Sequence, residues 1–169
     1  MMSNEGFDQS DWETAKDTAK AFAGLLADEP KLKVLDAIEG AELKSLNSLW
    51  KENLQYPRAE YVGVYFIFSE KGKLLYVGKA SNSSSIGIRL SSYFKTDPHN
   101  KTKYSCTGQW KTKPAWVGAL GIQSIKERRI ASDGRTRLPE YSWVAAGIEE
   151  FLIDQLDEKI GLSENTIGK

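Results

Sequence analysis

Apolar residues near the start of the chain recur every three or four positions, which is the spacing of an α-helix. The apolar positions are Trp12, Ala15, Ala19, Phe22, Ala23 and Leu26. Ser10 and Glu13 have the Ser-x-x-Glu spacing of a capping box, in which each side chain accepts a hydrogen bond from the backbone of the other residue. The pattern predicts a helix over residues 10–26 that begins with this box.

The next thirty residues also favour helices. Pro30 suits the first turn of a helix and Gly40 suits its end. A third helix is predicted from the apolar residues Leu43, Leu46, Leu49 and Trp50. We therefore expect residues 1–57 to form an α-helical N-terminal extension. Apolar stripes of this kind are usually packing surfaces, so the extension is assigned no chemistry, and a protein partner or self-association through it stays open.

After Pro57 the pattern changes to that of strands. Residues 61–68 and 74–78 are rich in β-branched and aromatic side chains, and the polar segment 69–73 between them supplies a turn. These segments predict a β-hairpin. The apolar spacing of residues 86–94 then predicts a helix after a run of serines.

The remaining pattern predicts a strand over residues 116–125 and a closing helix over residues 142–160. The order is hairpin, helix, strand and helix. We therefore expect an α+β fold in which helices flank a small, largely antiparallel sheet of three strands. This second domain spans residues 58–169.

Composition and charge limit the classes of function. The chain has 169 residues and 40% apolar residues, which is enough for one globular core. Its 23 basic and 23 acidic side chains cancel, which by itself argues against a nucleic-acid partner. Residues 71–137, however, carry fourteen basic and three acidic side chains, a net charge of +11. This segment suits a surface that binds a polyanion, although solvated surface lysines would give the same count.

Single cysteine and histidine residues exclude other chemistries. Cys106 cannot form a disulfide within the chain. Cys106 and His99 together provide only two ligands, whereas a zinc site normally needs four. The N-terminus lacks a basic and apolar signal, and no apolar run approaches the roughly 18 residues that a membrane span needs. We expect a cytoplasmic protein without a membrane partner.

Glu149 is an acidic residue on the apolar side of the closing helix. Its direction falls among those of Ile148, Leu152 and Leu156, whereas the neighbouring acid Glu150 points to the opposite side. An inward carboxylate needs a partner, because burial of an unpaired charge costs several kcal/mol. Mg²⁺ or Mn²⁺ would be one such partner, and a basic residue, Lys79 or Arg89, would be the structural alternative.

The order of several short motifs resembles the GIY-YIG nuclease family. The matched segments are Gly63-Val64-Tyr65, Tyr76-Val77-Gly78-Lys79, Arg89 to Phe94, Ala145 to Ile153 around Glu149, and Asn165. The resemblance is closest to the catalytic module of the UvrABC-type bacterial excision-repair incision subunit. It covers about residues 61–165 and leaves the first sixty residues outside.

The resemblance implies a set of roles for these residues. Tyr65 would be the general base toward an attacking water, and Tyr76 would hydrogen-bond near the scissile phosphate. Glu149 would bind the divalent ion, and Lys79 and Arg89 would neutralise the charge that grows on the phosphoryl oxygens. The supporting residues would be Gly63 and Gly78, which allow close backbone approach, and Asn165.

Further cations are candidates for contact with DNA. Lys111 and Lys113 lie between Trp110 and Trp116, an arrangement that suits stacking on bases and binding of phosphates, although core packing explains Trp116 equally well. A basic hairpin or loop is predicted from Arg128, Arg129, Arg135 and Arg137.

These observations predict a metal-dependent endonuclease that hydrolyses DNA. Two alternatives stay open: a module on the same fold that binds nucleic acid without cutting it, and a protein-interaction domain whose basic surface is incidental. A steep salt dependence of DNA affinity would argue against the protein-interaction domain, because only DNA binding releases many counterions.

Overall fold

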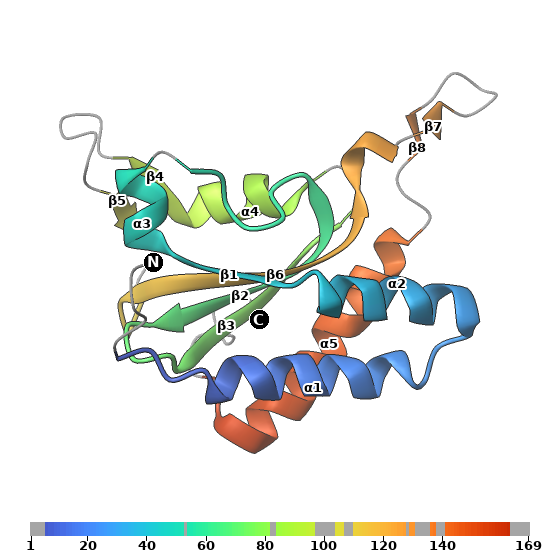
Figure 1. Cartoon of the computed structure of the whole chain (residues 1–169), viewed down its shortest axis with the longest axis horizontal. Coiled ribbons are helices and arrows are strands. Elements are labelled where there is room, and N and C mark those ends of the chain that lie inside the picture. Colours follow the sequence, from blue (N-terminus) through green and yellow to red (C-terminus); the bar gives the residue numbers. More distant parts are fainter. Residues whose placement is uncertain are drawn as a thin grey trace.

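A computed structural model describes residues 6–52, 54–81, 84–96, 104–106, 110–127, 129–130, 136–137 and 141–162. Its centre is an antiparallel sheet with the strand order β1-β6-β2-β3 (Figure 1). The strands are β1 (Glu42–Ser45), β2 (Tyr61–Ser69), β3 (Leu74–Ala80) and β6 (Pro114–Ser124). The α+β class is confirmed. The predicted number of three strands is wrong, because β1 adds a fourth at the edge beside β6.

Helices cover both faces of the sheet (Figure 1). One face packs against α1 (Ser10–Ala23), α2 (Asp28–Glu39) and α5 (Ser142–Ile160), and the other against α3 (Leu46–Lys51) and α4 (Ile86–Tyr93). The short elements are β4 (Phe94–Thr96) paired with β5 (Tyr104–Cys106), η1 (Ile125–Glu127), and β7 (Arg129–Ile130) paired with β8 (Thr136–Arg137). The predicted hairpin and the helices at α4 and α5 are confirmed.

Strand β2 separates the two buried clusters. Val64, Phe66 and Phe68 face α1 and α5, whereas the alternate residues Tyr65 and Ile67 face α3 and α4. The strand lies between β6 and β3, so nearly all of its side chains are buried. The strand therefore contributes apolar side chains to both layers of the core, and the alternation places Tyr65 on the α3 and α4 side.

Strand β1 occupies a segment that we predicted as part of a helix. The spacing of Leu43 and Leu46 is compatible with a helix, but the helix α3 begins only at Leu46. Residues 42–45 instead pair with β6, with Leu43 opposite Gly118. Strand β6 lies more than seventy residues later in the chain and supplies the hydrogen bonds of this strand, so the local sequence pattern does not predict the pairing.

The start of α1 differs from the predicted capping box. Ser10 lies inside the first turn of the helix, so its side chain cannot cap the helix. The carboxylate of Asp8 accepts the backbone N–H of Ser10 at 2.9 Å, and Glu13 pairs instead with Lys16 at 2.8 Å. Asp11 accepts the backbone N–H of Leu74 at 2.7 Å, which joins the helix to β3.

Helix α1 belongs to the same buried cluster as the sheet and α5. Trp12 packs edge-on against Phe66 and Phe68, with ring centroids 5.4 and 5.9 Å apart. It also lies over Gly118, where an added Cβ would come within 2.9 Å of the indole ring. The predicted boundary between residues 57 and 58 stays a prediction.

This packing makes Trp12 a strong test of that boundary. We expect Trp12→Ala to lower the free energy of unfolding by about 3–5 kcal/mol, because a large buried ring is lost and a cavity remains. The matched control is Trp143→Ala, whose side chain is 56% exposed, with an expected change within about 0.5 kcal/mol. Urea denaturation followed by circular dichroism measures both. Equal stability of the two variants would contradict a shared core.

None of the helices in the described part of the chain is long and apolar enough to cross a lipid bilayer.

Candidate active site

Three tyrosine hydroxyls meet on the α3 and α4 side of the sheet. Tyr65 comes from β2, Tyr76 from β3 and Tyr93 from the last turn of α4. The Tyr65 hydroxyl donates to Tyr93 Oη at 3.3 Å, and the Tyr93 hydroxyl donates to Tyr76 Oη at 3.2 Å. We call these three residues the tyrosine cluster.

Glycine at position 78 makes room for the tyrosine cluster. Gly78 lies opposite Tyr65 in the pairing of β2 with β3, and Tyr76 precedes it by two residues on the same face. A Cβ at Gly78 would lie 2.5 Å from the Tyr65 hydroxyl and 2.7 Å from the Tyr76 ring. Gly63 serves the sheet instead, because a Cβ there would lie 2.0 Å from the Leu120 carbonyl oxygen.

Trp110 closes one side of the tyrosine cluster. Its ring lies edge-on to Tyr76 and Tyr93, with centroids 6.1 and 5.9 Å apart. Lys111 and Lys113 follow it and are exposed. Trp116 lies elsewhere and packs against Phe7, with a centroid distance of 4.6 Å. Trp110 and Trp116, which flank the lysines in the sequence, therefore lie in different parts of the structure.

Glu149 forms an ion pair with Lys79 at the β3 edge of the sheet. Lys79 Nζ lies 2.7 Å from Glu149 Oε2, and the two side chains are 35% and 12% exposed. Ile148 and Leu152 on the same helix are buried in the core, whereas Glu150 is exposed. The inward carboxylate is thus paired with Lys79, one of the two basic residues that the sequence left open as alternatives to a metal ion.

Arg89 lies on the exposed side of α4, one turn before Tyr93. Its charge lowers the pKa of Tyr65 and of Tyr76, which places the guanidinium within electrostatic reach of both phenols. The helix presents Arg89 and Tyr93 on the same side because four residues separate them. The exposed cation therefore lies within electrostatic reach of the tyrosine cluster.

Burial keeps the phenols in their neutral form. Tyr65 is fully buried, and this burial raises its pKa well above the ordinary value for tyrosine, more than the nearby Tyr93 does and against the opposing effect of Arg89. The pKa of Tyr76 is also raised, first by burial and then by its hydrogen bond with Tyr93, with a further contribution from the charge of Glu149. Both hydroxyls are proton donors at neutral pH.

Glu149 fits one mode of divalent-metal binding. No group of three or more histidine, cysteine, aspartate or glutamate side chains lies together in the part of the chain that the structure describes. Mg²⁺, however, is commonly bound through one or two carboxylates, with water and substrate phosphates as its other ligands. A single carboxylate that is 12% exposed and within electrostatic reach of Tyr76 suits this mode.

Several predicted site residues lie outside this description. Arg128, Arg135 and Asn165, as well as His99, fall outside the described residues. Arg129 and Arg137 are backbone partners in the antiparallel pairing of β7 with β8, and their contact with DNA stays a prediction. The structure brings Tyr65 and Tyr76 together over Gly78, with Arg89 in electrostatic reach of both phenols. The Lys79–Glu149 pair reaches the β3 edge from the α5 side, and the charge of Glu149 acts on Tyr76.

Sequence reasoning did not select Tyr93 as a site residue. The interval of four residues from Arg89 was a usable signal, because it places both side chains on one side of α4. Tyr93 instead entered the prediction as one of several apolar residues on that helix. Its hydroxyl joins the other two phenols, and this role follows only from the way α4 packs on the sheet.

Known proteins show similarity to part of the chain. UvrABC system protein C of Histophilus somni strain 2336 is 31% identical over 97 residues, which are 57% of this chain and 14% of that protein. UvrABC system protein C of strain 129Pt gives the same values. The chain therefore covers 14% of the length of these relatives. No family model and no solved structure matches the chain.

Proposed function

We propose that the protein is a metal-dependent endonuclease of the GIY-YIG type that hydrolyses DNA phosphodiester bonds. The observation that carries the proposal is the tyrosine cluster with Arg89, Lys79 and Glu149 at its border. The similarity to UvrABC system protein C supports it, because the motifs independently resemble the incision subunit of a UvrABC-type system. The proposal concerns phosphodiester cleavage alone, since the chain covers 14% of those relatives.

Arg89 and Lys79 would bind the phosphate. Arg89 is exposed beside two phenols, and its planar group can donate to two phosphoryl oxygens at once. Lys79 is 35% exposed and can turn from Glu149 toward a phosphate oxygen. Negative charge grows on these oxygens during attack, so cations fixed beside them lower the barrier.

Glu149 would hold a divalent ion, either Mg²⁺ or Mn²⁺. The ion would supply Lewis-acid stabilisation of the phosphate and of the leaving oxygen. Lys79 would then release Glu149 and remain beside the phosphate. The low exposure of the carboxylate favours this role, because few water molecules compete for its oxygens.

Tyr76 would contact the attacking water. It is partly exposed, whereas Tyr65 is fully buried behind Tyr93. We therefore propose that Tyr76, rather than Tyr65, contacts the attacking water. Tyr65 and Tyr93 would orient the Tyr76 hydroxyl. Proton transfer to Tyr76 requires its phenolate, which Arg89 favours and the nearby charge of Glu149 disfavours.

A second candidate is a module that binds nucleic acid without cutting it. The Lys79–Glu149 contact of 2.7 Å favours this candidate, because it neutralises the carboxylate without a metal ion. The exposed cations Arg89, Lys111 and Lys113 would bind phosphates in either case. Only a cleavage assay separates the two candidates.

The test uses supercoiled plasmid with the full-length protein. We expect Mg²⁺ or Mn²⁺ to support conversion to nicked circles, and we expect excess chelator to stop it, because the proposed chemistry requires the ion. Agarose gels measure the conversion. Plasmid that stays supercoiled with either ion, while a gel-shift assay shows binding that weakens steeply with salt, would favour the non-cutting module instead.

A further inference from the structure

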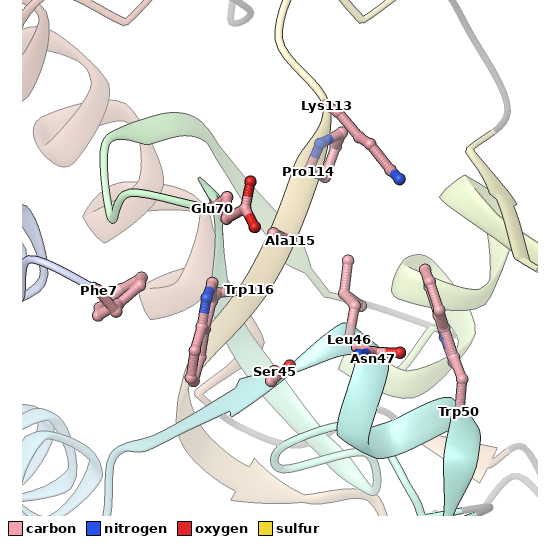
Figure 2. A pocket seen from close by; sticks show the side chains of 10 residues that line it. All are labelled: Phe7, Ser45, Leu46, Asn47, Trp50, Glu70, Lys113, Pro114, Ala115 and Trp116. Atoms are coloured by element: carbon pink, nitrogen blue, oxygen red, sulfur yellow. The ribbon is translucent and has the colours of Figure 1, made fainter. Parts of the chain in front are cut away.

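A cavity of about 490 Å³ lies beside the start of β6, away from the tyrosine cluster (Figure 2). Residues of α3, the turn after β2 and the first residues of β6 line it. In Figure 2 Trp116 and Trp50 stand on opposite sides of the space, with Leu46 and Asn47 between them. The volume lies in the range of small-molecule sites.

Both tryptophans pack against another aromatic ring. Trp116 packs against Phe7 with a centroid distance of 4.6 Å, and Trp50 packs against Phe94 at 6.2 Å. Each indole therefore contacts another aromatic ring and also lines the cavity, as Phe7 does. Walls that are already positioned lose little conformational entropy when a flat ligand enters.

Polar groups at the cavity suit the edge of a nucleobase. Asn47, Glu70 and Lys113 line the space, and all three side chains belong to exposed residues. An amide pairs with the donor and acceptor groups of a base, and a carboxylate accepts from an exocyclic amine. Lys113 supplies a cation for the phosphate of the same nucleotide, and Figure 2 shows its side chain reaching over the opening.

A short segment connects this cavity with the tyrosine cluster. Trp110 contacts Tyr76 and Tyr93, and Pro114, four residues later, lines the cavity. Four residues span at most about 14 Å when extended. Lys111 and Lys113 lie along this segment and are exposed, so the phosphates of a strand can follow it from one site to the other.

We propose that this cavity binds one nucleobase of the DNA strand that is cut. The inference rests on the proposed endonuclease function and adds a second point of contact. The base lies within about four nucleotides of the scissile phosphate, because a stacked strand rises about 3.4 Å per nucleotide along its axis and the connecting segment spans at most about 14 Å. Stacking on tryptophan makes the site tolerant of sequence, while Asn47 and Glu70 favour some bases over others.

The test compares two oligonucleotides with the same number of phosphates. One is a fluorescein-labelled single strand of about eight thymidines, within the range that single-strand binders cover, and the other is its fully abasic counterpart. Fluorescence anisotropy with the full chain in excess chelator measures both affinities without cleavage. We expect the wild-type protein to prefer the thymidine strand by about tenfold or more, as base stacking on aromatic residues provides.

Two variants obstruct the cavity while its walls stay in place. Ala115→Phe places a ring inside it, and Asn47→Trp covers it from an exposed position on α3, so that one variant remains if the other does not fold. Ala21→Phe is the matched control, because Ala21 is exposed on α1 and remote from the cavity lining. We expect the obstructed variants to lose the preference for thymidine and the control to keep it.

The outcomes separate this inference from the proposed function. An unchanged preference in both obstructed variants would overturn the base site, even if wild-type protein nicks plasmid with Mg²⁺. A preference that disappears in these variants would support the base site, even if plasmid stays intact and the endonuclease proposal fails. Equal wild-type affinity for the two strands would also overturn it.

Discussion

Glu149→Gln should lower metal-dependent cleavage by about 10³-fold or more, the largest single effect that we expect. Glutamine preserves the size of the side chain but removes the charge that a divalent ion needs. The amide also cannot form the ion pair with Lys79. Plasmid nicking at saturating Mg²⁺, followed over time on gels, measures the loss.

Glu150→Gln is the matched control for Glu149→Gln. The two glutamates are adjacent, but Glu150 is exposed on the other side of α5, so its removal should change the rate less than about twofold. Affinity for DNA in chelator should be equal or higher in Glu149→Gln, because a negative charge near the phosphates is gone. Equal cleavage by both variants would contradict a metal on Glu149.

The stability of Glu149→Gln should remain close to that of the wild-type protein. The lost pair includes a lysine that is 35% exposed, and ion pairs of this kind contribute about 1 kcal/mol or less. A thermal melt of both variants checks this point. A large drop in activity with an unchanged melting temperature would therefore come from the site.

Hydrophobic periodicity predicted the helices, whose backbone hydrogen bonds are local, and the strands with clear apolar runs. The helices α4 and α5, the hairpin of β2 and β3, and strand β6 belong to this group. Strand β1 did not follow from its own pattern. Its residues are only partly buried, and its pairing with β6 depends on contacts across seventy residues.

The candidate site was likewise only partly predictable from the sequence. The inward direction of Glu149 follows from helical phase, because its apolar neighbours must face the core. The choice of Lys79 as its partner did not follow, since a metal ion and Arg89 were also consistent with the pattern. The side chains of the tyrosine cluster come from three separate elements, and their contact can be recognised only from the tertiary packing.

The cation count illustrates a further limit. Residues 71–137 have a net charge of +11, which the sequence shows directly. Lys79 nevertheless pairs with Glu149, and Lys126 pairs with Glu60 at 2.6 Å. Charges from acidic segments thus reduce the basic surface after folding, and only the three-dimensional arrangement shows which cations are available to a phosphate.

Tyr76→Phe should lower the cleavage rate by about 10²–10³-fold, which is typical for loss of a general acid or base. The variant keeps the ring that packs on Trp110 and removes only the hydroxyl. Tyr65→Phe should have a smaller effect, because Tyr65 is buried and its hydroxyl is hydrogen-bonded to Tyr93, which in turn is hydrogen-bonded to Tyr76. Single-turnover cleavage measures both variants, with Tyr61→Phe on the same strand as Tyr65 as the control.

The pH profile distinguishes a base from a positioning group. Burial raises the pKa of Tyr76, so the phenol is protonated at neutral pH and its reactive phenolate increases about tenfold with each pH unit below that pKa. The wild-type rate should therefore rise with pH from 7 to 9, and Tyr76→Phe should lose this rise. If Tyr65→Phe loses the rise while Tyr76→Phe keeps it, the buried tyrosine is the base, and the contact with water has been assigned to the wrong phenol.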